Sequence, residues 1–279
     1  MKWPAFSGSS STMPIGPQRI VCLTEEPTEL LYALGQQQRI VGISGFTVRP
    51  AQARAEKPRV SAFTSAKVDR ILALKPDLAI GFSDIQADIA AALIRAGVEV
   101  WIANHRSVAG ILDYVQRLGA LVGVPEPARA YAAQLAAGVE RVRAAAAAFP
   151  RRPRVYFEEW DDPPISAIAW VSELVGVAGG EDIFPQRAAS SLATGRIVAD
   201  PLEVVRAAPQ LIIGSWCGKK FRPERVAARP GWADVPAVRD GELHEVKSPL
   251  ILQPGPAALT DGLARLHAII CGWHERHPS

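Results

Sequence analysis

The sequence has little cysteine. Its 279 residues contain only Cys22, Cys217 and Cys271, and no two of them form a CxxC pair. An odd number without short spacings excludes a disulfide framework and a cysteine-rich metal site. This usage fits a reducing compartment, and equally an oxidising one in which the thiols are buried.

The chain also lacks an apolar run near the roughly 18 residues that a membrane span requires. We therefore expect no membrane-spanning segment. Residues 1–18 hold no apolar core of about 7–15 residues, so they do not predict a secretory signal, and we expect a flexible segment there. The net charge of +3, without a block of Lys and Arg, predicts no nucleic-acid partner.

Catalytic motifs are absent as well: the sequence shows no Walker A, GxGxxG, HExxH or GxSxG pattern. Cys217 is the one candidate nucleophile, because the ammonium groups of Lys219 and Lys220 would lower the pKa of an exposed thiol. No histidine lies near it in the sequence, so an inert thiol, buried or on a cleft wall, is the alternative. We expect a binding protein that is not an enzyme and has no intrinsic cofactor.

The chain does contain alternating strand and helix patterns. Apolar runs predict strands at residues 19–23, 39–44, 78–81 and 98–103, and helical spacing falls at residues 25–35, 68–74 and 84–96. This alternation predicts parallel βαβ units.

Residues 126–148 are rich in Ala, Leu, Glu and Arg and predict a helix about 35 Å long. We interpret it as a rigid strut between two lobes, with an ordinary alanine-rich domain helix as the alternative. The predicted organisation is a flexible segment at 1–18, a lobe at 19–124, a connecting helix at 125–150 and a second lobe at 151–279.

Two stretches of the chain match each other at an offset of 133 residues. Residues 71–81 and 204–214 each place a proline after a helix and a glycine at the end of a strand, and residues 19–27 likewise resemble 154–163. Together the matches suggest that the lobes arose by internal duplication.

Ligands bind beyond the carboxyl ends of parallel strands. This rule selects seven loops as the walls of a cleft between the lobes, at residues 24–26, 45–49, 82–84, 104–107, 158–164, 215–221 and 247–256.

Three features of these loops suggest ligand contacts. Four carboxylates at residues 158–162 could chelate a hard cation or accept hydrogen bonds from a ligand, unless they are a solvated loop. Trp216 offers a face for stacking beside Gly218, which lets the backbone approach a ligand. His105 is either a ligand to a metal or cobalt centre or a hydrogen-bonding residue of its loop.

The sequence resembles the cobalamin-binding proteins of vitamin B12 importers, a branch of the helical-backbone (class III) substrate-binding proteins of ABC importers. The stretches that carry the resemblance are residues 19–31, 68–80, 162–164 and 179–184. It implies an α/β fold of two Rossmann-like lobes joined by a long rigid helix, with the ligand in the cleft between them. The implied ligand is cobalamin or another corrinoid, the alternatives being haem, a ferric siderophore or a metal.

The resemblance also implies site residues. Aromatic residues of both lobes hold the corrin ring in that family, and Phe46 and Phe63 occupy the first-lobe positions. The two second-lobe positions hold Glu159 and Arg196 instead of aromatic residues. Trp160 and Trp216 could replace the missing aromatic contacts from neighbouring positions. The full set that we predict to bind the ligand is Phe46, Phe63, Phe82, His105, Glu159, Trp160, Arg196, Trp216, Cys217 and Lys219.

Family members dock on a permease dimer through one carboxylate on each lobe. The matching positions are Asp69 and either Leu202 or Glu203, and we predict Asp69 and Glu203 as the pair in a monomeric protein. The family acts outside the cytoplasmic membrane. Because residues 1–18 predict no export signal, two interpretations stay open: a cytoplasmic relative uncoupled from transport, or an incomplete or engineered start.

Overall fold

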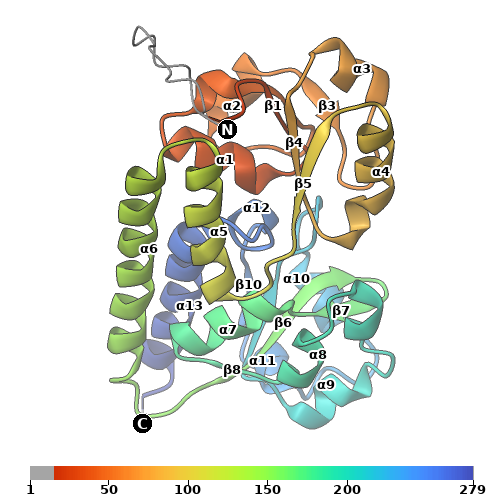
Figure 1. The fold of residues 1–279 in the computed structure, drawn as a ribbon. Helices are drawn as coiled ribbons and strands as arrows, with labels where there is room; N and C mark the ends of the chain where they lie inside the picture. The colour runs from red at the N-terminus through yellow and green to blue at the C-terminus, as the bar shows by residue number, and fades with distance from the viewer. Residues whose placement is uncertain (1–15, 279) are drawn as a thin grey trace, which may run out of the picture.

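Five parallel strands form the sheet of the first lobe, in the order β3-β2-β1-β4-β5 (Figure 1). The computed structural model describes residues 16–278, so most of the predicted flexible segment lies outside the described residues. The strands are β1 (Ile20–Cys22), β2 (Ile40–Ser44), β3 (Arg59–Ser61), β4 (Leu78–Phe82) and β5 (Glu99–Ala103).

Alternate residues of these strands enter two different cores, because successive side chains of a strand point to opposite faces. Ile20 and Cys22 pack with α1, α5 and α6 (Pro125–Ala146), whereas Val21 and Leu23 pack with α3 and α4. The helices of this lobe are α1 (Glu25–Ala33), η1 (Gln37–Arg39), α2 (Ala51–Glu56), α3 (Val68–Ala73), η2 (Asp84–Gln86), α4 (Ala87–Arg95) and α5 (Val108–Leu121).

The second lobe has a mixed sheet in the order β10-β9-β6-β7, with β8 paired to β6. All its pairs are parallel except β6 with β7. Its strands are β6 (Arg154–Asp161), β7 (Pro164–Ser166), β8 (Glu181–Asp182), β9 (Leu211–Gly214) and β10 (Leu243–Glu245). Its helices are α7 (Ala169–Ala178), α8 (Pro185–Ala188), η3 (Ala193–Arg196), α9 (Leu202–Ala207), α10 (Pro223–Ala227), α11 (Pro236–Arg239), α12 (Ser248–Ile251), the π-helical turn η4 (Ala258–Gly262) and α13 (Leu263–Arg276).

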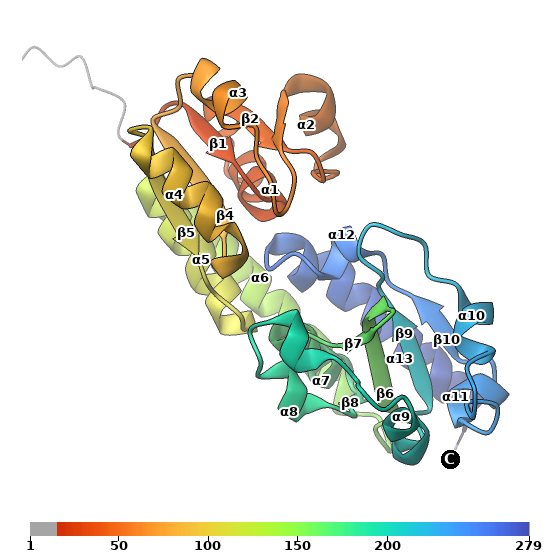
Figure 2. The same ribbon diagram turned by 90° about the vertical axis from the view of Figure 1, so that its right-hand side faces the viewer.

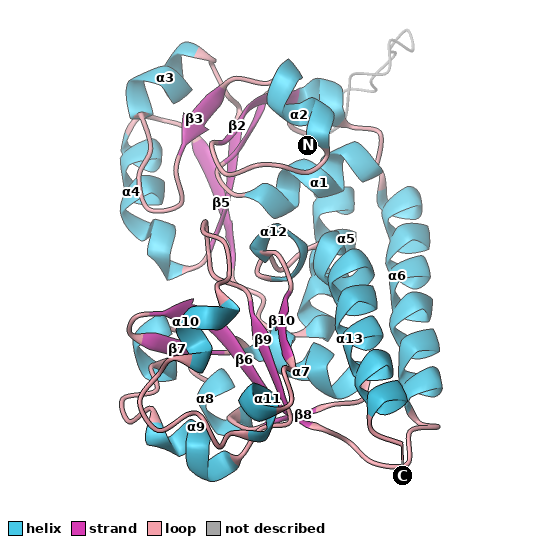
Figure 3. Cartoon of the chain, turned by 180° about the vertical axis from the view of Figure 1, so that it is seen from behind, coloured by secondary structure: helices cyan, strands magenta, loops and turns pink. Residues whose placement is uncertain are grey.

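The predicted connecting helix is α6 (Pro125–Ala146), which runs along one side of both lobes (Figures 1 and 3). Pro125 and Glu126 suit its first turn, where a missing N–H costs nothing and a carboxylate meets the positive end of the helix dipole. The strut is not a single helix, because α5 and α13 lie beside α6. One hydrophobic core continues from β1 and β4 through α5, α6, α7 and α13 to β6 and β9. That shared core fixes the position of one lobe relative to the other.

The two lobes share a local hydrogen-bond arrangement at the positions that the sequence comparison pairs. The guanidinium of Arg19 donates to the carbonyl of Lys75, and that of Arg154 donates to the carbonyl of Ala208. Lys75 and Ala208 both have left-handed backbones, at φ 47° and 45°, although side chains disfavour that region. Each precedes a proline and then a central strand, at the offset found in the sequence. Two lobes built on one plan present the carboxyl ends of their strands to each other across a gap (Figure 2).

Within residues 16–278, no helix combines the length and the apolar character needed to cross a membrane.

Candidate functional site

A cavity of about 320 Å³ lies between the lobes, where the two sheets present their carboxyl ends. All seven predicted loops contribute at least one residue to its wall. Segments that the loop rule does not select also reach it, among them α2 through Arg54 and the start of α7 through Trp170. The expected place of the cleft and the observed cavity therefore coincide.

Three phenylalanines of the first lobe line this cavity. Phe46 follows β2 in a turn that Ser44 closes, accepting through Oγ from the Phe46 backbone N–H at 3.2 Å. Its side chain is 50% exposed, which is unusual for so large an apolar group. Phe63 is half-buried, whereas Phe82 is buried and packs edge-on against Trp170 with ring centroids 6.2 Å apart. The first lobe thus offers a flat apolar wall with Phe46 as its accessible part.

The acidic segment at residues 158–162 is not the loop that its composition suggests. Strand β6 continues to Asp161 and turns back into β7. Glu158 is fully buried and bonded to two Arg229 nitrogens, at 2.6 and 2.9 Å, and to the Trp216 indole nitrogen at 2.9 Å. Asp161 is paired with Lys219 and Arg225. The idea that these acids chelate a hard cation is wrong for these two, because cations from distant segments neutralise them.

Glu159 and Arg196 both line the cavity, and they form an ion pair with a shortest N–O distance of 2.5 Å. The Arg196 side chain is 3% exposed and also donates to the Ser166 carbonyl at 2.7 Å. The two positions where the resemblance implies aromatic residues are thus occupied by one neutralised pair. This wall of the cavity is polar but carries no net charge from the pair.

Trp160, Trp216 and Lys219 lie outside this cavity. Trp216 is 2% exposed and packs in the core of the second lobe, so its ring offers no stacking face to the cleft. The Trp160 indole N–H donates to the Asp162 carbonyl at 2.9 Å. The Lys219 ammonium lies over the Trp160 ring, 3.8 Å from its centroid, and contacts Asp161. The expected compensation of the missing aromatics by these tryptophans does not occur in this structure.

Cys217 lies on the cavity wall, with its residue exposed. Burial of the thiol, together with Glu159 and Glu25, raises its pKa. The expected lowering by Lys219 and Lys220 is therefore wrong, because Lys219 is turned towards Asp161. This thiol is an ordinary wall residue, as in the inert alternative.

His105 lies behind the cavity. Its Nε2 is 2.6 Å from the Pro254 carbonyl oxygen, which can only accept, so Nε2 carries the proton. Its ring stacks on Tyr114 at 4.5 Å, and burial lowers its pKa to about 4. His105 is a neutral hydrogen-bonding residue that joins the lobes, and the donated Nε2 is not free to bind a metal. Within residues 16–278, no cluster of three or more His, Cys, Asp or Glu side chains fits a metal ion.

Two acids at the start of α1 were not among the predicted binding residues. Glu25 lines the cavity at 8% exposure, and burial raises its pKa to about 7. Glu26 is 1% exposed, accepts from the Thr24 hydroxyl at 2.6 Å, and has its pKa raised to about 8 by burial. The loop rule includes both residues, but nothing in the sequence signals that they are buried without cations.

The two predicted docking carboxylates occupy equivalent places, in the first turns of α3 and α9. Asp69 is exposed. Glu203 is engaged by Arg187, whose Nη2 lies 2.6 Å from one carboxylate oxygen. The two carboxylates thus lie in corresponding helices and differ in charge environment, although the offset of 133 residues pairs Asp69 with Leu202.

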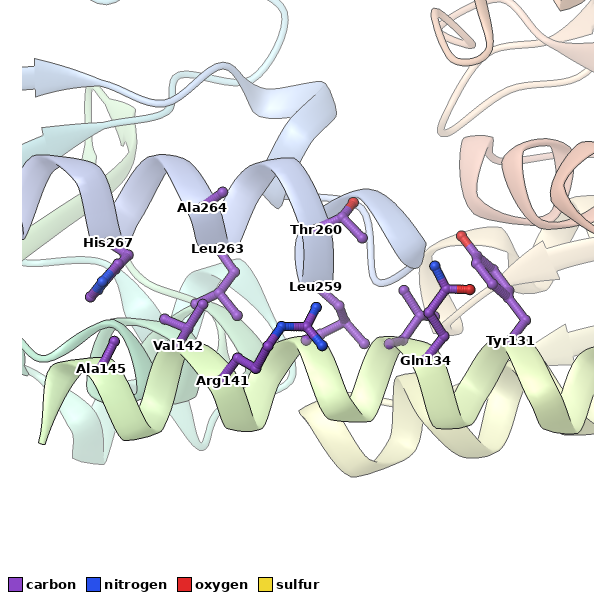
Figure 4. A pocket seen from close by; sticks show the side chains of 12 residues that line it. Tyr131, Gln134, Arg141, Val142, Ala145, Leu259, Thr260, Leu263, Ala264 and His267 are labelled. Atoms are coloured by element: carbon purple, nitrogen blue, oxygen red, sulfur yellow. The ribbon is translucent and has the colours of Figure 1, made fainter.

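A second cavity, of about 450 Å³, lies between α6 and α13 (Figure 4). Apolar side chains such as Leu135 and Leu259 dominate its wall, and Tyr131 and Arg141 also line it. None of the predicted binding residues reaches it.

Comparison with known proteins points in one direction. The model of a family described as periplasmic binding protein matches residues 20–250. A vitamin B12-binding protein of Vibrio campbellii is 28% identical over 187 residues, which cover 65% of this chain and 66% of that protein. Another, of Vibrio parahaemolyticus, is 25% identical over 259 residues, covering 90% and 89%.

Solved structures show the same fold. The periplasmic vitamin B12 binding protein of Vibrio cholerae superimposes with a TM-score of 0.74 at 23% identity, over 94% of this chain and 100% of that one. The periplasmic haem-binding protein of a Roseiflexus species gives 0.77 at 24% identity, over 91% and 100%. Two α/β lobes joined by a long helix are thus the architecture of these proteins and of this chain.

Proposed function

The chain belongs to the periplasmic binding protein family, and from that premise we propose that it is a non-catalytic solute-binding protein of an ABC-type importer. Its proposed ligand is cobalamin or a related corrinoid, held in the cavity between the lobes.

The observation that carries this proposal is the cavity itself. The parallel strands of both sheets direct their carboxyl ends into it, which is where open α/β sheets bind ligands. The groups on its wall suit binding better than chemistry, because the Cys217 thiol has a raised pKa and the His105 ring is occupied by Pro254. A nucleophile needs a base within hydrogen-bond reach, and neither residue supplies that arrangement.

A large flat ligand is supported by the exposed ring of Phe46 and the phenylalanines beside it. The cavity volume of about 320 Å³ lies at the small end of the range for small-molecule sites, roughly 300–1,000 Å³. A macrocycle would therefore be held by one edge, with the remainder at the mouth. The side chain of Phe46 could then pack against one face of the bound macrocycle.

Haem is the second candidate, and Arg54 is the observation that favours it. Arg54 is an exposed cation on the cavity wall, and guanidinium groups pair well with carboxylates such as the propionates of haem. A ferric siderophore remains a further alternative of the same kind. A bare metal ion has less support, since the described residues hold no cluster that fits one.

Calorimetric titration of the purified chain separates these ligands. We expect saturable 1:1 binding of cyanocobalamin, and weaker or no binding of haemin and of a ferric catecholate. Saturable binding of haemin without binding of any corrinoid would replace the corrinoid proposal by the second candidate.

The partner in this proposal is a permease dimer, contacted through Asp69 and Glu203. Charge reversal at each, Asp69→Lys and Glu203→Lys, is expected to abolish stimulation of the ATPase of the reconstituted transporter without changing ligand affinity. Asp88→Lys is the matched control, because Asp88 is an exposed acid in the first turn of α4 in the same lobe. Stimulation that survives the double reversal would discard the docking pair. A wild type that gives no stimulation would instead favour a relative that is not coupled to transport.

A further inference from the structure

Glu25 lines the cleft and carries a buried carboxyl oxygen without a partner among the described residues. It stands in the first turn of α1, its side chain is 8% exposed, and it lines the cavity between the lobes. Within residues 16–278, its buried Oε2 has no hydrogen-bond partner. A buried oxygen without a partner is costly to the folded protein. If the carboxyl group turns this oxygen towards the cavity, a ligand group that donates to it supplies a hydrogen bond that the oxygen lacks in the free protein.

No cation of the cavity neutralises Glu25. Across the cleft, Glu159 is held by Arg196 at 2.5 Å. Arg106 is shared between the Ser191 carbonyl and Asp84, each at 3.1 Å. Two further titratable groups line the same cavity, Cys217 after β9 and Arg54 on α2. Glu26, the next residue on α1, is buried and does not line it.

We propose that Glu25 forms a polar subsite of the cleft that receives a carboxamide group of the ligand and discriminates against a carboxylate at the same place. This inference rests on the proposed function, because it names the chemistry by which the cleft selects among macrocyclic ligands. A carboxamide supplies both a donor and an acceptor, which a carboxyl group complements in either protonation state. A carboxylate supplies only acceptors and adds a like charge.

Burial raises the pKa of Glu25 to about 7, so both of its forms are populated near neutral pH. The ionised form accepts one N–H from the amide. The protonated form accepts that N–H and also donates its O–H to the amide carbonyl. Amide binding is therefore expected to weaken moderately as the pH rises from 6 to 8, and carboxylate binding is expected to weaken more, because like charges then meet in a low-dielectric site.

Corrinoids and haem differ in this respect. The corrin periphery carries carboxamides, whereas haem carries two carboxylates. The subsite thus favours a corrinoid over haem, although the cation of Arg54 also lines the cavity.

The test compares two corrinoids on the same ring: dicyanocobinamide, with amide side chains, and dicyanocobyrinic acid, with carboxylates in their place. Dissociation constants are measured by tryptophan quenching at pH 6 and pH 8 for the wild type, Glu25→Gln and Glu25→Ala. Glu26→Gln is the matched control, because Glu26 is the neighbouring buried acid and does not line the cavity.

We expect the wild type and Glu26→Gln to prefer the amide ligand by about tenfold or more at pH 8, the range of one lost charged hydrogen bond. Glu25→Gln should reduce that preference at least fivefold while still binding the amide, since its own amide pairs with either group. Glu25→Ala should reduce it too, provided that its thermal unfolding matches the wild type.

An unchanged preference in Glu25→Gln would overturn the inference, as would a wild type that binds both corrinoids equally. Failure of the wild type to bind either corrinoid would instead overturn the proposed function.

Discussion

Replacing Phe46 with alanine is expected to weaken ligand binding while leaving the free energy of unfolding nearly unchanged. The side chain is 50% exposed in the free protein, so little of its apolar surface contributes to the fold. A phenylalanine side chain offers roughly 150–250 Å² in total, so a ligand that covers the exposed half removes about 100 Å² from water.

This area sets the expected size of the effect. At about 25 cal/mol per Å², the exposed half corresponds to about 2.5 kcal/mol, and a ligand that covers only one ring face gains about 1 kcal/mol. Phe46→Ala should therefore raise the dissociation constant roughly 5- to 60-fold, and Phe46→Trp should retain binding.

The assay is calorimetric titration with cyanocobalamin, together with urea unfolding of the same samples. Ile94→Ala is the control, because Ile94 is 60% exposed on α4 and does not line the cavity. A dissociation constant for Phe46→Ala within twofold of the wild-type value would refute the role of this ring. A large loss of stability in the same variant would refute the premise that the ring is free to meet a ligand.

Three further predictions concern the groups around the cleft. Arg229→Ala leaves Glu158 buried without its cation and should lower the free energy of unfolding by about 3–5 kcal/mol; a loss under about 1 kcal/mol in urea unfolding would contradict the assigned pair. Burial raises the pKa of Glu26 to about 8 in the folded protein. Its contribution to stability is therefore complete below the pKa of the unfolded chain and is lost as the pH rises towards 8, because the folded protein then has to ionise a buried acid. The free energy of unfolding should then fall from pH 6.5 to 8.5, a range above the one in which His105 has the opposite effect. The fall should be smaller in Glu26→Gln, and equal slopes of the two proteins against pH would refute the role of Glu26. Cys217, in a Cys271→Ser background, should alkylate with an apparent pKa above 9, and a value near 7 would contradict its raised pKa.

Much of the fold can be predicted from the sequence because its signals are local. The apolar runs of β1, β2, β4 and β5 and the alanine-rich helix α6 each show their period within one window. Strands β3 and β8, of three and two residues, are too short to show a period. They form because the neighbouring strands β2 and β6 offer them backbone partners.

The acidic end of β6 shows where local signals fail. A run of four carboxylates is typical of a solvated loop, yet Glu158 is fully buried. The cation that makes this possible, Arg229, is 71 residues away along the chain. Nothing at either position announces the pairing, so composition alone misleads.

The position of the cleft follows from topology, but the side chains that face it do not. Trp216 and Cys217 are consecutive, and only Cys217 lines the cavity, because Trp216 turns into the second-lobe core. The presence of a tryptophan in a loop sequence does not tell whether its ring faces the cleft or the core. Glu25 shows the converse, since an acid at a helix start is ordinarily a solvated group and here lies buried at the ligand wall.

The measurement that tests the central claim most directly is a titration of the purified wild-type chain with cyanocobalamin, followed by tryptophan fluorescence. Trp170 lines the cavity and is 1% exposed, so a bound chromophore in the cleft should quench it. The account predicts saturable quenching at one corrinoid per chain that is weakened in Phe46→Ala. Fluorescence that shows no saturable change with any corrinoid would contradict the claim.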